Sequence, residues 1–161
     1  ALVSPQNKAL VGIIDQPFLK ERYIGVAGRQ TLLNGRAINA NPGIDLSQTI
    51  TLKTTPGMFK TSRQQKILDA VERQCGSKSV WGGDCYNYAC MAAGFGPPTV
   101  VIECDMKYFD YAALIPVVEG AGGKITNWLG HSLGPNDNEV LAVSNPTLHA
   151  KILENIRAQE L

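Results

Sequence analysis

The chain has 161 residues, of which 44% are hydrophobic and 18% charged, so it can bury a core and general intrinsic disorder is excluded. Its formal net charge of +1 provides no basic excess that would attract nucleic acid or a membrane surface. The longest apolar runs, such as residues 111–118, are too short to span a bilayer, so we expect neither nucleic acid nor a membrane among its partners.

The first forty residues predict short β-strands. Apolar and β-branched runs cover residues 10–14 and 23–27. The pair Asn34-Gly35 predicts a two-residue hairpin, because Asn and Gly tolerate the positive φ of a type I′ turn. Residues 39–43 then have the composition of a connector. These strands are few and short, so we expect a sheet with an open edge.

From residue 49 onward, strands and helices alternate. We expect strands at residues 49–53, 80–81, 99–102, 124–128 and 140–143. We expect helices at residues 62–74, 84–93, 110–119 and 146–158, with Ser62 and Asn145 as caps. This alternation predicts an α/β layered domain with helices covering a sheet.

The cysteines and histidines do not form a recognisable metal site. No Cys-x-x-Cys pair occurs among Cys75, Cys85, Cys90 and Cys104, and the two histidines, His131 and His149, stand apart. A disulfide framework is not expected in a chain long enough to rely on its core. We therefore expect buried free thiols in a reducing cytoplasm.

Two segments place polar residues where a strand meets a helix. Gly82 and Gly83 precede Asp84 and a predicted helix, so the backbone there can approach a ligand and offer N–H groups. The segment 101–113 runs from a buried strand past three carboxylates, the last of which, Asp110, begins an apolar helix. Together these features outline a hard-cation site, because Mg²⁺ favours carboxylate oxygens.

Each of these residues also has a purely structural interpretation. Asp84 and Asp110 stand where an N-cap belongs, and Asp is among the best capping residues. Glu103 fits a solvated strand end, because Glu is rarely fully buried; burial would require a partner or a bound cation. The glycines before Asp84 fit a plain turn. Taken singly, none of these signals is specific.

Four segments carry a resemblance to a known family. Residues 109–113 (Phe-Asp-Tyr-Ala-Ala) and 117–123 (Val-Val-Glu-Gly-Ala-Gly-Gly) resemble the C-terminal signature of the inositol monophosphatase family, with Phe109 in place of the usual Trp. Residues 82–86 (Gly-Gly-Asp-Cys-Tyr) and 12–17 (Gly-Ile-Ile-Asp-Gln-Pro) also match, so the resemblance covers nearly the whole chain. The Gly-Asp-Cys-Tyr sequence is most similar to the bacterial histidinol-phosphate phosphatase branch.

The resemblance implies a layered α/β sandwich of the inositol monophosphatase type and Mg²⁺-dependent hydrolysis of a phosphate monoester, with histidinol phosphate as substrate. Asp110 matches a family Asp that ligates a catalytic Mg²⁺, and Glu103 matches a carboxylate that holds the alcohol portion of the substrate. Gly83, Asp84 and Cys85 match the segment that lines the substrate pocket. Asp84 stands where inositol-specific members have a Thr. The resemblance therefore implies an acidic side chain at this position, which suits a cationic or imidazole-bearing substrate. Dimers are common in the family, so a homodimer is a further expectation.

One departure from the family pattern limits these expectations. The family's Asp-Pro-x-Asp-Gly-Thr motif and the Glu before it, which supply most of the metal ligands, are absent from this sequence. The resemblance therefore implies a C-terminal fragment, with remnant β-strands of an N-terminal α+β domain over residues 1–43 and a C-terminal α/β domain over residues 44–161. We expect this fragment alone to be inactive.

Two alternatives stay open at this point. The substrate could be inositol-1-phosphate or a related sugar or nucleotide phosphate, since such esters are substrates in related families. The chain could also belong to a non-catalytic module that keeps the fold without the missing metal ligands.

Overall fold

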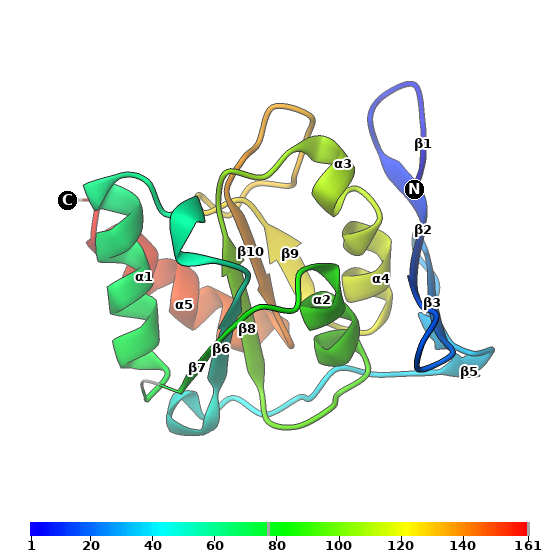
Figure 1. The fold of residues 1–161 in the computed structure, drawn as a ribbon, viewed down its shortest axis with the longest axis horizontal. Helices are drawn as coiled ribbons and strands as arrows, with labels where there is room; N and C mark the ends of the chain where they lie inside the picture. The colour runs from blue at the N-terminus through cyan, green and yellow to red at the C-terminus, as the bar shows by residue number, and fades with distance from the viewer. Residues whose placement is uncertain (77, 161) are drawn as a thin grey trace.

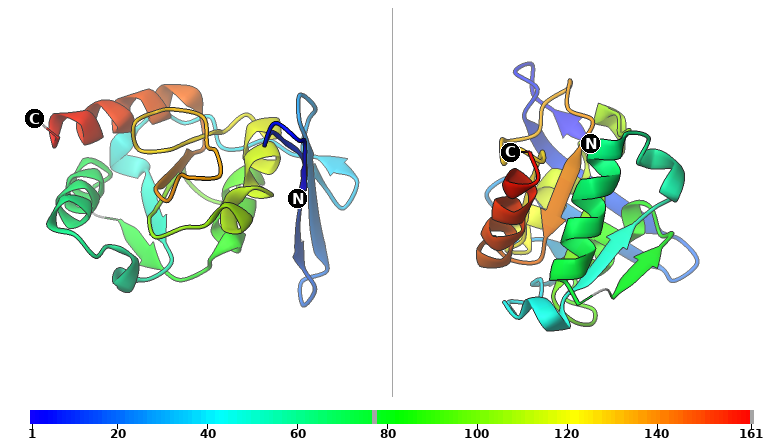
Figure 2. Two further views of the ribbon diagram at one scale, coloured as in Figure 1. Left: turned by 90° about the horizontal axis from the view of Figure 1, so that it is seen from above. Right: turned by 90° about the vertical axis from the view of Figure 1, so that its left-hand side faces the viewer.

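The computed structural model describes residues 1–76 and 78–160, which form two five-stranded sheets with helices between and beside them (Figure 1). Sheet A contains strands from residues 2–37 and sheet B contains strands from residues 50–143. Helices α1 (Ser62–Gln74) and α5 (Pro146–Ala158) cover one face of sheet B, and α2 (Cys85–Ala92) and α4 (Leu114–Gly120) lie between sheet B and sheet A (Figure 2). The predicted α/β layered class is therefore confirmed. Within the described residues, no helix is both long and apolar enough to cross a membrane.

Sheet A is an antiparallel sheet built from the first part of the chain in sequence order. Its strands are β1 (Leu2–Val3), β2 (Ala9–Gln16), β3 (Glu21–Val26), β4 (Leu32–Leu33) and β5 (Arg36–Ala37). Asn34 and Gly35 join β4 to β5 with φ values of 49° and 80°, which confirms the predicted tight hairpin. The sequence did not predict β1, a two-residue strand that exists only through its pairing with β2.

Sheet B is a mixed sheet with the order β7-β6-β8-β10-β9. Its strands are β6 (Ile50–Lys53), β7 (Ser79–Trp81), β8 (Thr99–Glu103), β9 (Lys124–Thr126) and β10 (Val140–Val143). Strand β6 is parallel to both β7 and β8, whereas β10 is antiparallel to β8 and β9. Strand β9 ends earlier than predicted, because the Asn127 side chain accepts hydrogen bonds from the next backbone N–H groups and forms a turn.

The helices are α1 (Ser62–Gln74), α2 (Cys85–Ala92), α3 (Tyr108–Tyr111), α4 (Leu114–Gly120) and α5 (Pro146–Ala158). Two short 3₁₀ turns, η1 (Leu46–Gln48) and η2 (Pro56–Met58), flank β6. Asn145 caps α5 as predicted, since its Oδ1 accepts from Leu148 N at 2.9 Å. The prediction that Ser62 caps α1 is wrong, because Thr61 fills that position in a capping box with Gln64.

The prediction of one continuous helix over residues 110–119 is wrong. The structure contains two helices instead, α3 and α4, which meet at Ala112 and Ala113. Pro116 explains the break, because proline has no N–H to donate to the carbonyl of Ala112 and its ring would collide with that group. In the first turn of a separate helix α4 the same proline is tolerated.

The core consists of two clusters on opposite faces of sheet B. Alternate residues of β8 point to opposite sides: Val100 and Ile102 pack under α1 and α5, whereas Val101 packs toward α2 and α4. The cluster on the α2 and α4 side also includes Ile14 and Tyr23 of sheet A. One apolar cluster therefore joins the strands of both sheets through the helices between them.

A pair of glycines lets α4 lie directly on sheet A. Gly12 on β2 and Gly25 on β3 are cross-strand partners. A Cβ atom at Gly12 would lie 1.9 Å from the carbonyl oxygen of Ala113, and one at Gly25 would lie 2.3 Å from Val117 N. Only glycine permits this close approach of helix to sheet. The pair thus fixes the position of α4 and, with it, of α3.

Candidate functional site

The candidate site lies at the carboxyl ends of three neighbouring parallel strands, β7, β6 and β8. Thr54 directly follows β6, Asp84 follows β7 after two glycines, and Glu103 is the last residue of β8. Ligands of α/β proteins bind at this edge of a sheet, because the strand ends and the following loops converge there. The structure places Asp110, on α3, at the same edge, since all four residues line one cavity of about 440 Å³.

The walls of this cavity are rich in carboxylates. It is lined by Thr54, Met58, Asp84, Cys85, Tyr88, Glu103, Asp105, Met106, Asp110 and Leu114. The lining thus contains four acidic residues and, within the described part of the chain, no Lys, Arg or His. Lys60 is paired with one of these carboxylates, Asp105, in an exposed ion pair. A cavity of this composition attracts cations and repels anions.

The loop that presents Asp84 has an unusual backbone. Gly82, Gly83 and Asp84 all have positive φ, at 98°, 104° and 46°. A Cβ atom at Gly83 would lie 2.2 Å from Asn87 Oδ1, and the Asn87 amide donates to Gly82 O at 2.8 Å. Gly83 is therefore a structural support for the loop and does not itself line the cavity.

The capping interpretation of Asp84 is not supported. The residue occupies the N-cap position of α2, but its side chain makes no capping hydrogen bond. Because its carboxylate is not used by the helix, it stays available within the cavity that it lines.

Glu103 is buried, so the alternative of a solvated strand end is wrong. Only 1% of the residue is exposed. Its Oε1 accepts a hydrogen bond from the Thr54 hydroxyl, and its Oε2 accepts one from Tyr88 OH at 2.6 Å. Burial raises the pKa of the Glu103 carboxyl, the two hydroxyl hydrogen bonds oppose this shift, and the charges of Asp84 and Asp110 add to it.

Asp110 is exposed and occupies the third position of α3, so the expectation that it begins the helix is wrong. Its Oδ2 accepts from Lys107 N at 2.8 Å, which closes the first turn of α3. One of its two oxygens thus supports the helix. The helical turn orients the carboxylate within the cavity wall.

Cys85 lies beside Asp84 and is exposed, whereas the sequence predicted buried thiols. The structure records all four cysteines as free, with Cys75 and Cys104 buried and Cys90 partly buried. Burial, and then the charge of Asp84, raise the pKa of the Cys85 thiol. Cys85 therefore stays protonated at neutral pH and is a poor nucleophile.

Sequence reasoning missed Tyr88 and Thr54, the two residues that contact Glu103. A signal for Tyr88 was present, because it lies three residues after Cys85 within the predicted helix and so faces the same side of it. Nothing in the sequence indicated Thr54, which reaches Glu103 from a separate strand end.

The described residues supply only part of a metal site. Carboxylate oxygens are suitable ligands for Mg²⁺, and Asp84, Glu103 and Asp110 provide them. Within residues 1–76 and 78–160, however, no group of three or more His, Cys, Asp or Glu side chains is placed to hold a metal ion. A complete site would need further ligands.

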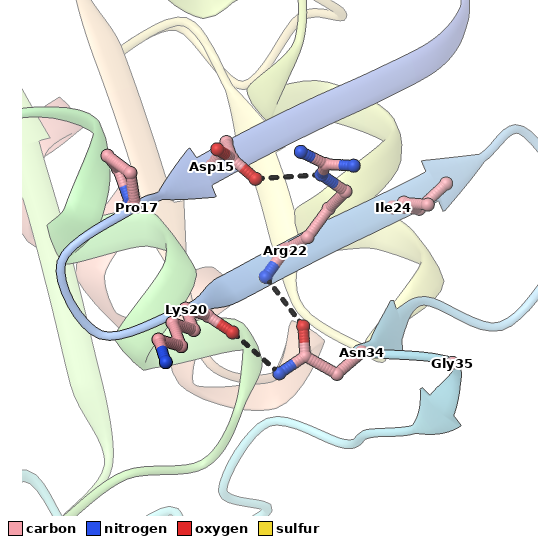
Figure 3. A pocket seen from close by; sticks show the side chains of 7 residues that line it. All are labelled: Asp15, Pro17, Lys20, Arg22, Ile24, Asn34 and Gly35. Carbon is pink, nitrogen blue, oxygen red and sulfur yellow. Dashed lines mark hydrogen bonds and ion pairs between the residues drawn. The ribbon is translucent and has the colours of Figure 1, made fainter.

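A second hollow, of about 520 Å³, lies over β2, β3 and the β4–β5 hairpin (Figure 3). Its acidic residue, Asp15, is paired with Arg22 at 2.7 Å, and Asn34 is bonded to backbone atoms of Arg22 and Lys20. The polar groups drawn in this hollow are thus largely satisfied by one another. It has one acidic residue, whereas the candidate site has four.

The sequence model of the inositol monophosphatase family matches residues 1–161. The chain therefore belongs to the inositol monophosphatase family. The structure is similar to a solved structure of an inositol monophosphatase from Zymomonas mobilis, with a TM-score of 0.85 and 32% sequence identity. The match covers 93% of this chain and 58% of that chain.

Two curated relatives are also phosphatases by name. The chloroplastic bifunctional phosphatase IMPL2 of Arabidopsis thaliana is 37% identical over 94% of this chain and 45% of its own length. A histidinol-phosphatase of Chlorobaculum parvum is 26% identical over 91% of this chain and 55% of its own length. The chain thus spans about half the length of the curated relatives it matches.

Proposed function

We propose that the full-length protein hydrolyses a phosphate monoester in a Mg²⁺-dependent reaction and that histidinol phosphate is its substrate. The observation that carries this proposal is the cavity in which Asp84, Glu103 and Asp110 converge without a lining cation. Such a cavity would repel the phosphate dianion, so phosphate can enter only with divalent cations that offset the carboxylate charge. Membership of the inositol monophosphatase family supports this reading.

Asp110 is the residue of this chain that we assign to the metal, because its exposed carboxylate keeps one oxygen free of the α3 hydrogen bond. Bound Mg²⁺ would supply an activated water and neutralise charge on the leaving alkoxide. The chain's own contribution is to hold Asp110 in place through the first turn of α3, while Asp84 and Glu103 bind the alcohol half of the ester.

A cationic alcohol half fits this arrangement. The Asp84 side chain makes no capping hydrogen bond to α2, and Glu103 is held with both oxygens hydrogen-bonded at the cavity wall. Two carboxylates facing a bound alcohol complement an ammonium or imidazolium group better than neutral hydroxyls. The match to a protein named histidinol-phosphatase agrees with this choice.

The Asp84→Thr variant tests the substrate. If Asp84 contacts a cation, the change should lower kcat/KM for histidinol phosphate by about 10-fold, the loss expected from one charge-assisted contact. The loss for inositol-1-phosphate should be smaller. Side-by-side kinetics with full-length protein and Mg²⁺ would measure both. Equal losses on the two esters would remove the argument for a cationic substrate.

Two alternative functions have specific support. Inositol-1-phosphate, or a related sugar or nucleotide phosphate, is favoured by the similarity to the Zymomonas mobilis inositol monophosphatase structure. A non-catalytic module is favoured by the absence of a complete metal cluster among the described residues. The coding sequence upstream discriminates the module from the enzyme, because an encoded Asp-Pro-x-Asp-Gly-Thr motif would support the enzyme.

The free thiols are consistent with a reducing compartment, and we propose the cytoplasm. The Arabidopsis thaliana relative is chloroplastic by name, so the family is not confined to one compartment. We also propose a homodimer, in line with the family resemblance, which sedimentation of the full-length protein would test.

A further inference from the structure

Glu103 is held by hydroxyl groups from two different elements. Tyr88 lies within α2 and is fully buried, and its OH donates to Oε2 at 2.6 Å. Thr54 follows β6 and donates to Oε1. Because each carboxylate oxygen has its own donor on a separate element, the plane of the carboxylate is fixed and its rotation is blocked.

This arrangement leaves part of the carboxylate's bonding capacity unused. An ionised carboxylate has about four lone-pair sites, and two are occupied by the hydroxyl groups. Glu103 itself lines the cavity, where Asp84 and Asp110 are its acidic neighbours. A group that enters the cavity and donates to Glu103 is therefore favoured if it carries positive charge.

We propose that Tyr88, together with Thr54, is a positioning residue for substrate recognition: it holds Glu103 so that a free lone pair accepts an N–H donor from the cationic alcohol half of the phosphate ester. The inference rests on the proposed function and deepens it. Tyr88 acts through Glu103, because its own hydroxyl hydrogen is already donated. Substrate selectivity thus depends on a residue that acts through its hydrogen bond to the recognition carboxylate.

The chain offers a closely matched control in Tyr23. This tyrosine is also fully buried, and its OH donates to a carboxylate oxygen, Glu21 Oε2, at 2.7 Å. Tyr23 lies on sheet A and does not line the candidate cavity. Tyr88→Phe and Tyr23→Phe therefore each delete a tyrosine hydroxyl that donates to a glutamate oxygen, once at the wall of the candidate cavity and once away from it.

In the full-length enzyme, Tyr88→Phe should raise KM for histidinol phosphate about 10-fold, as expected when one charge-assisted contact is lost, with little change in kcat. KM for inositol-1-phosphate should rise less, and Tyr23→Phe should leave both values near wild type. If Tyr88→Phe changed both esters equally, or no more than Tyr23→Phe does, the positioning role would be refuted.

A double-mutant cycle separates positioning from a general effect on packing. In a Glu103→Gln background, Tyr88→Phe should add almost nothing to KM, because the residue acts only through Glu103. An unchanged 10-fold effect in that background would show that Tyr88 acts by another route and would overturn the proposal.

A spectroscopic measurement decides the point independently of activity. The chain is labelled with ¹³C at its glutamate side chains, and the Glu103 carboxyl signal in the NMR spectrum is assigned by its loss in Glu103→Gln. The chemical shift of this signal should change in Tyr88→Phe and in Thr54→Val. It should not change in Tyr23→Phe. A signal that stays in place in both variants would overturn the positioning role. If the full-length wild type hydrolysed neither ester, the proposed function would fail, while this measurement would still decide whether Tyr88 positions Glu103.

Discussion

His149 is a buried histidine on α5, with 5% of its surface exposed. Its Nε2 lies 2.8 Å from Thr126 Oγ1, and the Thr126 hydroxyl donates to Asn127 O at 2.8 Å. With that hydroxyl hydrogen already donated, Thr126 Oγ1 accepts the hydrogen bond from His149 Nε2–H. Burial, and then the charges of Lys124 and Arg157, lower the pKa of His149 to about 4.

This shift predicts that acid destabilises the fold through His149. The unfolded chain takes up a proton as the pH falls through about 6.5, whereas folded His149 resists protonation until about pH 4. The contribution of neutral His149 to the free energy of unfolding is therefore fully present above pH 6.5, and it is lost as the pH falls from 6.5 to 4. Between pH 7 and 4.5 the loss should be about 2 kcal/mol.

Urea unfolding gives the free energy of unfolding of the wild type and of His149→Gln at pH 7 and at pH 4.5. The two proteins have the same carboxylates, so the effect of carboxylate protonation cancels in the difference between them and the contribution of His149 remains. The variant should lose about 2 kcal/mol less on acidification. Identical pH dependence in both proteins would contradict the assignment.

At this scale, the sequence indicated candidate site residues but not the hydrogen bonds that hold them, and the functional roles of these residues stay predictions. Local patterns single out Asp84, Glu103 and Asp110, and the family resemblance adds Gly83 and Cys85; all of these except Gly83 line one cavity. The burial of Glu103 was not predictable from its own segment, because the hydroxyl groups that make burial tolerable come from Thr54 and Tyr88, far away in sequence. Local patterns identify carboxylates, whereas only the fold supplies their partners.

At the scale of elements, the contact of α4 with sheet A depends on Gly12 and Gly25. Gly12→Ala should destabilise the protein by about 3 kcal/mol, because the new methyl group would collide with the backbone of Ala113 and force the helix off the sheet. Gly57→Ala is the control, since a Cβ atom there meets nothing within 4 Å, and it should change stability by less than about 0.5 kcal/mol. Chemical denaturation would show both effects, and equal midpoints would contradict the packing argument.

Element boundaries were predictable where a local signal sets them. Pro146 and Asn145 marked the start of α5 correctly, because a cap and a first-turn proline act through their immediate neighbours. Strand β1 was missed because its two residues are extended only through pairing with β2. The break between α3 and α4 had a local signal in Pro116, which the apolar pattern of the segment obscured.

At the scale of the whole molecule, the candidate site depends on elements distant in sequence. The ends of β6, β7 and β8 and helix α3 each contribute to the cavity, and sheet A supports the intervening helices through the shared core. The proposed division at residues 43 and 44 stays a prediction. The hydrophobic cluster on the α2 and α4 side of sheet B includes residues from both sides of this division, because Ile14 and Tyr23 pack there with residues of α2 and α4.

The last prediction concerns the catalytic capacity of this chain by itself. Phosphate monoester hydrolysis is among the slowest uncatalysed reactions, and enzymes accelerate it by up to about 10²¹-fold. Such acceleration requires metal ions held in a fixed geometry, and within residues 1–76 and 78–160 no group of three or more candidate ligand side chains is placed to hold a metal ion. We therefore expect the 161-residue chain, folded as judged by circular dichroism, to release no more phosphate from histidinol phosphate with Mg²⁺ than its Asp110→Asn variant. Mg²⁺-dependent turnover that disappears in Asp110→Asn would contradict this expectation, and it would mean that the carboxylates of this chain hold a working metal site without further ligands.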